Sequence, residues 1–336
     1  MDGRSTAQGG EDSGLVCGYL FAPGQPAREV ALGDLPQVQR EAPTGSFTWL
    51  HFNLAHMGAQ RWLDRQDQLT PAFHEALRDD MPSTAIERDE DALVAVLNDV
   101  HFHFGYEASD IATLWASVDR RLVVTARRSP LRSVDRLRLA IKRGEPIASS
   151  VELLERLLRA QAHVLVGIVR NVSREVDRIE DALLAGRVQV KRATLGAQRR
   201  LLVRLQRLLA PEPASLFRLL QHPPAWIQPD EAQQLHEASE EFSVVIRDMS
   251  ALQERIKLLQ EELGALLSER TGRSLFVLTV VTVLALPINI LAGLFGMNVG
   301  GVPLADHPRG FWVVAGLVLA FTAAAGGWAW WRARRG

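Results

Sequence analysis

Cysteine is almost missing from this chain of 336 residues, in which Cys17 is the only example. A single thiol excludes both a disulfide framework within the chain and a cysteine-rich zinc site, and it is typical of a reducing compartment. Residues 1–13 are polar and glycine-rich and lack the apolar core of a secretory signal. We therefore expect residues 1–14 to be a disordered tail, and we expect most of the chain to stay where it is made.

Signatures of common enzymes are missing as well. The sequence contains no phosphate-binding loop, no dinucleotide fingerprint and no nucleophile elbow. Its formal net charge of −1 gives no indication of nucleic acid as a partner. We predict that the protein is neither an enzyme nor an ATP-driven pump, and that it uses no cofactor.

What the chain does have is apolar sequence near its C-terminus. Two runs, 275–295 and 311–331, contain no charged residue, and as a helix the first spans about 30 Å, the thickness of a bilayer's hydrocarbon core. Arginines precede the first run and follow the second, whereas the loop 298–310 has one acidic and one basic residue, Asp306 and Arg309. Because positive residues favour the cytoplasmic side, we expect a multi-pass protein of the inner (plasma) membrane with both termini cytoplasmic.

The rest of the chain divides by pattern into two further domains. Runs that alternate like strands mix with helical ones up to residue 147, which predicts a cytoplasmic α/β domain over 15–147. The expected strands are 47–54, 92–104 and 122–125, and the expected helices are 60–63 and 71–78, with Thr70 as the N-cap of the second. Residues 148–273 are predicted to form a helical stalk, followed by a membrane domain over 274–336.

In the stalk, one helix is expected to begin after Ser149 or Ser150 and to end near residue 185, and a basic helix should follow to about residue 209. Prolines then interrupt the chain, and a last helix is predicted from Asp230 without a break to Phe295. It carries a heptad seam: Phe242, Val245, Met249, Leu252, Ile256, Leu259, Leu263 and Leu266. Such a seam packs against other helices in a left-handed supercoil, within one subunit or between subunits.

One face of the first apolar run is distinctive. It is formed by Leu275, Leu278, Thr282, Leu286 and Asn289, which are spaced three or four residues apart. An amide in apolar surroundings is costly unless it has a hydrogen-bond partner or lines water. Asn289 therefore indicates either a bond to a neighbouring helix or a water-filled pore.

Neither apolar run contains an acidic residue. A dehydrated divalent cation needs hard oxygen or imidazole ligands, which these runs do not supply at bilayer depth. Neutral amides and hydroxyls can instead hydrogen-bond to the water shell of an ion. We therefore expect any pathway to pass a largely hydrated cation, with leucine rings as a gate that closes by dewetting.

The first run ends in Gly296-Met297-Asn298, which is followed by Val299-Gly300-Gly301-Val302-Pro303. A Gly-Met-Asn turn between two C-terminal spans resembles the CorA-type metal ion transporter superfamily, and the continuation resembles its ZntB-like zinc transporter branch. The resemblance implies a funnel-shaped homopentamer whose long helices converge on the membrane. It also implies that Gly296, Met297 and Asn298 form the outer selectivity filter, with Asn298 holding the hydrated metal ion.

The ZntB-like branch is associated with zinc transport coupled to a proton gradient, so the resemblance implies zinc as the substrate. Magnesium members usually have an acidic segment after the motif, which is missing here. Two alternatives stay open: a magnesium, cobalt or nickel channel of the same family, and a non-transporting membrane-anchored oligomeric scaffold.

His101 and His103 are the remaining candidate metal ligands. They are two residues apart on an expected strand and would share one face. No third ligand has metal-site spacing, so exposed or hydrogen-bonded histidines on a sheet are the other interpretation.

Overall fold

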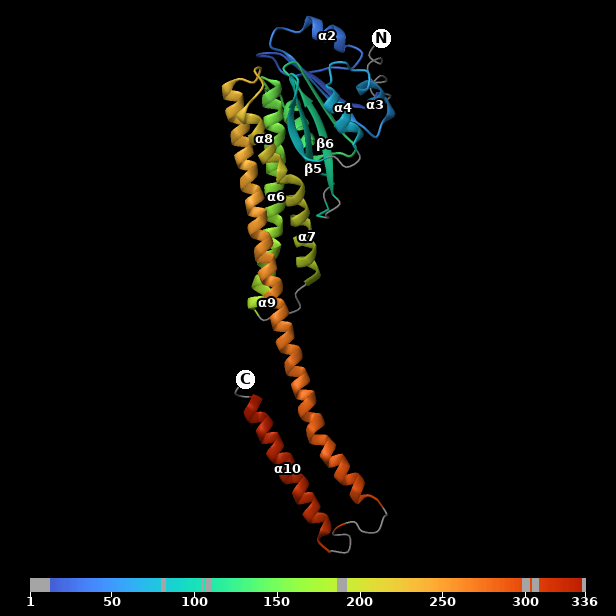
Figure 1. Cartoon of the computed structure of the whole chain (residues 1–336), viewed down its shortest axis with the longest axis vertical. Helices are drawn as coiled ribbons and strands as arrows, with labels where there is room; N and C mark the ends of the chain where they lie inside the picture. The colour runs from blue at the N-terminus through green and yellow to red at the C-terminus, as the bar shows by residue number, and fades with distance from the viewer. Residues whose placement is uncertain are drawn as a thin grey trace. The chain divides into compact units, whose positions relative to one another are not determined.

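The computed structural model describes residues 13–79, 83–103, 105–106, 110–185, 192–297, 303 and 308–333. It divides into two compact units, Met1–Gln260 and Glu261–Gly336, and one helix, α9 (Pro229–Phe295), has residues in both. Figure 1 shows the order of the elements along the chain. Residues 1–12 of the expected tail lie outside the described ranges.

A seven-stranded sheet lies at the centre of the first unit. Its strands are β1 (Leu15–Phe21), β2 (Arg28–Glu29), β3 (Phe47–Asn53), β4 (Ala85–Asp89), β5 (Ala92–Val100), β6 (Ile111–Val118) and β7 (Leu122–Arg127). Their order is β2-β1-β3-β7-β6-β5-β4, and each neighbouring pair is antiparallel except β3 and β7, which are parallel.

The strands expected at 47–54 and 122–125 are confirmed as β3 and β7. The strand expected over 92–104 is shorter, because β5 ends at Val100 and the backbone of Phe102 then donates to Pro130 O at 2.9 Å. The sequence did not predict β1, whose glycine looks unfavourable for a strand. A Cβ atom on Gly18 would lie 2.4 Å from Val30 O, so this close approach of two chain segments requires the glycine.

The helices cover both faces of the sheet and then continue beyond it. They are α2 (Leu35–Glu41), α3 (Met57–Leu63), α4 (Pro71–Arg78), α5 (Arg132–Lys142), α6 (Ser150–Leu184), α7 (Arg192–Leu209), α8 (Pro211–Gln221), α9 and α10 (Gly310–Ala333). The predicted start of α6 is confirmed, since Ser149 Oγ accepts a hydrogen bond of 3.1 Å from the backbone N–H of Glu152. The predicted α/β domain, long helix and two apolar C-terminal helices are confirmed in the same way.

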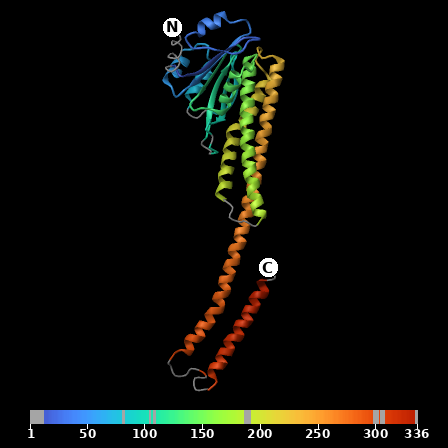
Figure 2. The same ribbon diagram turned by 180° about the vertical axis from the view of Figure 1, so that it is seen from behind.

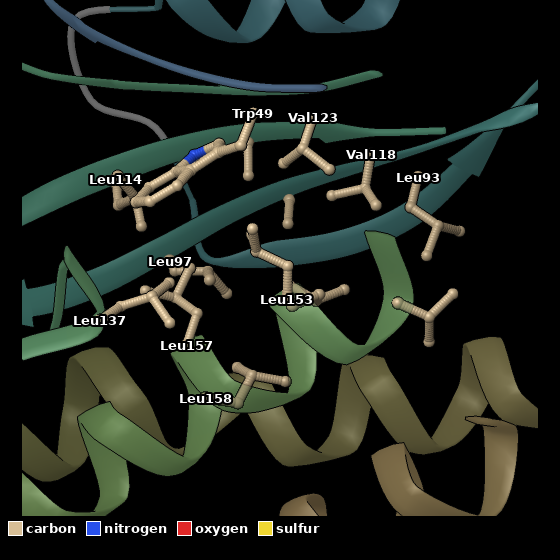
Figure 3. Packing of buried hydrophobic residues seen from close by; sticks show 14 of the residues in the cluster. Trp49, Leu93, Leu97, Leu114, Val118, Val123, Leu137, Leu153, Leu157 and Leu158 are labelled. Atoms are coloured by element: carbon tan, nitrogen blue, oxygen red, sulfur yellow. The ribbon is translucent and has the colours of Figure 1, made fainter. Parts of the chain in front are cut away.

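Each face of the sheet has its own hydrophobic core, because successive strand residues point to opposite faces. On one face, Leu50, Phe52 and Val124 pack with buried side chains of α2, α3 and α4. On the other face, Trp49 and Leu97 meet Leu153, Leu157 and Leu158 of α6, as Figure 3 shows. Leucines recurring at helical spacing therefore fix α6 against the sheet.

Helix α8 corrects one expectation. The proline-containing segment after residue 209 was predicted to be an interruption, but Pro211–Gln221 is a helix. Pro211 stands at its first position, where a proline loses no hydrogen bond because the first N–H groups of a helix have no partner within it. Prolines close together at a helix start thus resemble a breaker in the sequence.

The first turn of α8 also completes the sheet. Strand β4 pairs with β5 only as far as Val96. The backbone N–H of Asn98, two residues further along β5 and on the edge that faces β4, therefore has no partner in β4. The carboxylate of Glu212 takes that place, accepting from Asn98 N at 2.8 Å and from Gln161 Nε2 at 2.9 Å. Burial raises the pKa of Glu212 well above its usual range, against the opposing effect of these two hydrogen bonds.

The heptad seam of α9 is buried within one chain. Its members from Phe242 to Leu263 are all buried, and Leu266 is half-buried. Polar contacts along α9 identify its neighbours: Arg255 donates to Asp177 of α6, and Gln253 donates to Gln206 of α7. Both views show α6, α7 and this part of α9 side by side (Figures 1 and 2). Of the two alternatives for the seam, packing within a subunit is the one observed.

The buried carboxyl of Glu212 predicts how stability depends on pH. A carboxyl whose pKa is raised by folding binds more protons in the folded state than in the unfolded state. Its contribution to the free energy of unfolding is therefore fully present below the unfolded pKa of about 4.3, and it is lost as the pH rises through the pKa of the folded state. We expect the melting temperature of the detergent-solubilised protein to fall over that range, and to fall less in Glu212→Gln. The exposed Glu87→Gln on β4 is the matched control and should keep the wild-type pH dependence; an unchanged slope in Glu212→Gln would contradict the assignment.

Candidate functional site

The C-terminal part of α9 and helix α10 are the two helices of the described chain that are long and apolar enough to cross a membrane. Both belong to the second unit from Glu261 onward, and α10 runs beside the end of α9 in both views (Figures 1 and 2). Pro287 lies inside α9 without ending it. The two predicted spans are therefore helices, and the first is continuous with the stalk.

The predicted pore stripe lies on one fully exposed side of this helix. Its leucines have large exposed fractions: 58% for Leu275, 63% for Leu278 and 58% for Leu286. Thr282 and Asn289 on the same side are exposed too. No other described residue buries this side, so its polar groups face the surroundings of the single subunit.

The half-buried side chains of the span lie on the opposite side. They are Val280, Leu284, Pro287, Ile288 and Leu291. At about 100° per residue, this set is centred roughly 180° from the stripe that contains Thr282 and Asn289. Helix α10, which runs beside this part of α9 in both views, has half-buried side chains of its own, among them Val314, Val318 and Thr322. The second span thus leaves the polar stripe uncovered.

The polar groups on the stripe differ in what they bond. The hydroxyl of Thr282 donates to Leu278 O of its own helix at 2.9 Å, which leaves its lone pairs free to accept. In the part of the chain that the structure describes, the amide of Asn289 makes no hydrogen bond. The inter-helix bond considered as an alternative is therefore not made to the described side chains of α10, and the role of Asn289 stays a prediction.

The helix ends where the candidate filter begins. Helix α9 stops at Phe295, and the N–H of Gly296 still donates to Ala292 O at 2.9 Å. A Cβ atom at position 296 would lie 3.0 Å from that same carbonyl, closer than side chains normally come, which explains a glycine here. Met297 follows with 54% of its surface exposed, whereas Asn298 lies outside the described residues.

His101 and His103 lie beyond the end of β5 rather than inside a strand. His101 forms an isolated bridge with Leu131, and His103 is exposed in the turn that follows, with its ring edge-on to Phe102. Among the described residues, no group of three or more His, Cys, Asp and Glu side chains is arranged to hold a metal ion. The proposed pairing of the two histidines on a strand face therefore loses its structural basis, and their role as ligands stays a prediction.

Comparison with known proteins decides the family. Residues 44–335 match the family described as CorA-like Mg2+ transporter protein. The chain belongs to this family. CorA-like proteins transport divalent cations, so the expectation of a divalent cation transporter rather than an enzyme is confirmed, and so is the resemblance noted at the Gly-Met-Asn turn.

Individual CorA-like relatives align along nearly the whole chain. The divalent cation transporter CmaX of Pseudomonas aeruginosa is 26% identical over 330 residues, which are 98% of each chain. The structure of full-length CmaX superposes with a TM-score of 0.79 at 25% identity, and the match covers 96% of this chain and 98% of that one. The zinc transport protein ZntB of Pectobacterium carotovorum is 23% identical over 303 residues, 90% of each chain. The CorA magnesium transporter of Methanocaldococcus jannaschii shares the fold at 18% identity, with a TM-score of 0.74 over 92% of this chain and 96% of that one.

The sequence predicted the stripe but not the half-buried side that lies opposite it on the same helix. The half-buried positions from Val280 to Leu291 are all apolar and give no periodic signal against an apolar background. The only sequence feature that distinguished the two sides of this helix was the polar character of Thr282 and Asn289.

The two sides of the span predict a pattern of cysteine reactivity. In a Cys17→Ser background, Thr282→Cys and Asn289→Cys should react with a hydrophilic thiol reagent in proteoliposomes, because the reagent needs water and a thiolate. Val280→Cys and Ile288→Cys on the half-buried side are the matched controls and should be protected. Labelling measured by mass spectrometry tests this, and equal protection at all four positions would argue against water beside the stripe.

Proposed function

We propose that the protein is a homo-oligomeric transporter that carries zinc through a central pore lined by the C-terminal part of α9. The observation that carries this proposal is the uncovered polar stripe with Thr282 and Asn289 on the side opposite the second span. Facing lipid, an unbonded amide would be strongly destabilising. Surrounded by copies of the same helix, it would line water.

A homopentamer, as the family resemblance implies, would place five such stripes around one axis. The stalk offers a surface for this assembly that differs from the buried heptad seam. Val244, Ala251 and Leu258 are spaced seven residues apart on the exposed side of α9, and the exposed fractions of Val244 and Leu258 are 46% and 57%. An apolar stripe of this period suits helix packing between subunits.

The chemistry of the stripe suits a hydrated cation. Each subunit would contribute the hydroxyl oxygen of Thr282 and the amide of Asn289, which are neutral groups that hydrogen-bond to water in an ion's first shell. Rings of Leu275, Leu278 and Leu286 would form apolar constrictions that stop conduction when they dewet. At the outer end, Gly296 and Met297 would present Asn298 as the selectivity ring.

Zinc is supported by the relatives named ZntB and by the short motif after Asn298. Asp306 is the only acidic residue between the spans, so the loop provides a weak negative field for accumulating magnesium. We extend the proposal to coupling with a proton gradient, as in the ZntB-like branch. Magnesium, cobalt or nickel as the cargo is the second candidate, favoured by the match to a family named for Mg2+ transport.

The proposal includes the arrangement in the membrane. Both termini would be cytoplasmic and the loop 298–310 would face outward from the inner (plasma) membrane. The chain would divide into a tail over 1–14, an α/β domain over 15–147, a stalk over 148–273 and a membrane domain over 274–336. A non-transporting scaffold would have the same arrangement but no need for an amide on the uncovered stripe.

Zinc flux should depend on Asn298. We expect Asn298→Ala to assemble normally and to lose most of the uptake of radiolabelled zinc into liposomes, because the substitution removes the ring of amides that would hold the hydrated ion. Met297→Leu, which keeps the size and apolar character of the neighbouring side chain, is the control and should retain flux. Parallel assays with magnesium, cobalt and nickel, with and without a pH gradient, identify the cargo and the coupling; wild-type flux through Asn298→Ala would remove this residue from the filter.

Assembly should depend on the exposed stripe of the stalk. Native mass spectrometry of the detergent-solubilised chain should give one dominant mass near five protomers. Leu258→Glu should shift it to smaller species, since it places charge in the packed stripe, whereas Glu254→Gln on an exposed position nearby should not. A wild-type protein that is monodisperse as a monomer or dimer would overturn the shared pore.

A further inference from the structure

A cavity lined by two arginines lies in the first unit, far from the spans along the chain. A cavity of about 180 Å³ opens where β7 ends and α5 begins. Its polar lining consists of His51 on β3, Arg127 at the end of β7, and Asp135 and Arg138 on α5, with Phe102 and Leu131 as apolar neighbours. Two guanidinium groups and one carboxylate therefore share a small space.

A buried chain of hydrogen bonds fixes the orientation of Arg127. Thr125 Oγ1 accepts from Trp49 Nε1 at 2.8 Å and lies 2.8 Å from His51 Nδ1. Arg127 Nε donates to His51 Nε2 at 3.1 Å, so that nitrogen is an acceptor and the proton of neutral His51 sits on Nδ1. Burial lowers the pKa of His51 well below its usual range, and the two arginines add to this shift.

The bond to His51 occupies only Nε of Arg127. The two terminal nitrogens form no hydrogen bond or ion pair within the described ranges of the chain, so they are the groups that Arg127 can direct at the cavity. A guanidinium held through Nε presents its Nη1 and Nη2 groups as a planar fork, the geometry that matches an oxyanion.

The guanidinium group of Arg138 also has hydrogen-bonding capacity that is not used. Its Nε is buried and has no hydrogen-bond partner among the described residues, and its Nη1 lies 3.7 Å from Asp135 Oδ1, which is too long for a hydrogen bond. Arg138 also contacts Cys17, but burial raises the pKa of that thiol to about 12. The thiol is therefore protonated and does not neutralise the arginine.

The charges do not balance. Asp135 is the only carboxylate among the lining residues, facing two guanidinium groups. Burial lowers the pKa of Arg127, and repulsion from Arg138 lowers it further. Partly buried cations of like charge are unfavourable unless an anion joins them.

We propose that this cavity binds a phosphate dianion through the Nη1 and Nη2 groups of Arg127 and the guanidinium group of Arg138. Its volume is below the roughly 300–1,000 Å³ of pockets for drug-sized ligands, which favours free inorganic phosphate over a nucleotide. The orientation of Arg127 by His51 and the orphaned Nε of Arg138 are the two independent features that support an oxyanion. This inference does not rest on the proposed zinc transport.

The test is the binding of inorganic phosphate to the full-length protein in detergent, measured by isothermal titration calorimetry and by the melting temperature at constant ionic strength adjusted with sodium chloride. We expect saturable binding that raises the melting temperature. Arg138→Gln and Arg127→Gln should each weaken the affinity about tenfold or more, because each removes a charge-assisted hydrogen bond. Arg143→Gln, which removes an exposed arginine just after α5, is the matched control and should bind like the wild type.

Arg138→Lys separates binding from folding, because it keeps the positive charge that faces Asp135 but lacks the planar fork. A folded Arg138→Lys protein with weakened phosphate binding supports the proposal. A nucleoside monophosphate distinguishes the sources: binding of phosphate alone identifies the free anion, and equal binding of both shows that a phosphate monoester can enter. No saturable binding to the wild type, or undiminished binding to Arg138→Gln, would overturn the proposal.

Discussion

The structure depends on one continuous helix, α9, which runs on through Pro287 although that residue donates no backbone hydrogen bond. Pro229–Phe295 is one helix of 67 residues, about 100 Å at 1.5 Å per residue. A helix satisfies its own backbone groups in water and in lipid alike, so the same element can serve both environments. The difference between the two ends lies entirely in the side chains: a buried seam with a period of seven residues in the first unit, and a polar stripe on an apolar helix in the second.

The need of buried polar groups for hydrogen-bond partners links three features that first seem unrelated. Glu212 substitutes for a missing strand partner at Asn98 and thereby ties α8 to the sheet. Neither Asn289 nor Arg138 Nε has a hydrogen-bond partner among the residues that the structure describes. A buried or membrane-facing polar group without a partner is costly, which is why these two groups carry the proposals made above. For Asn289 we propose water and further subunits, and for Arg138 we propose an anion.

The sequence predicted those elements whose signals are local. Ser149 as a cap, Pro71 at the first position of α4 and the leucine periods of α6 and α9 all depend on neighbours within a few residues. Thr70 stands at the N-cap position of α4 as predicted, but its side chain makes no capping hydrogen bond to the described residues. Long-range features escaped prediction. Helix α8 was hidden because prolines tolerated in a first turn look like breakers, and β1 was hidden because Gly18 is required by a contact with Val30 that no local pattern reveals. The stripe of the candidate site was predictable, but the half-buried side opposite it was not, because the half-buried side chains of the first span are all apolar.

The core of the first unit has a consequence for how the chain is made. Leu235, near the start of α9, is fully buried in the same cluster as Tyr19 of β1, so the cluster closes only after nearly all of this unit has been synthesised. The parallel pairing of β3 with β7 likewise joins segments far apart in the chain, which slows folding. At about 5–20 residues per second, the ribosome reaches Leu275 roughly 2–8 seconds after Leu235. The segment that completes the soluble core and the segment that enters the membrane therefore leave the ribosome almost together, and folding and insertion overlap in time.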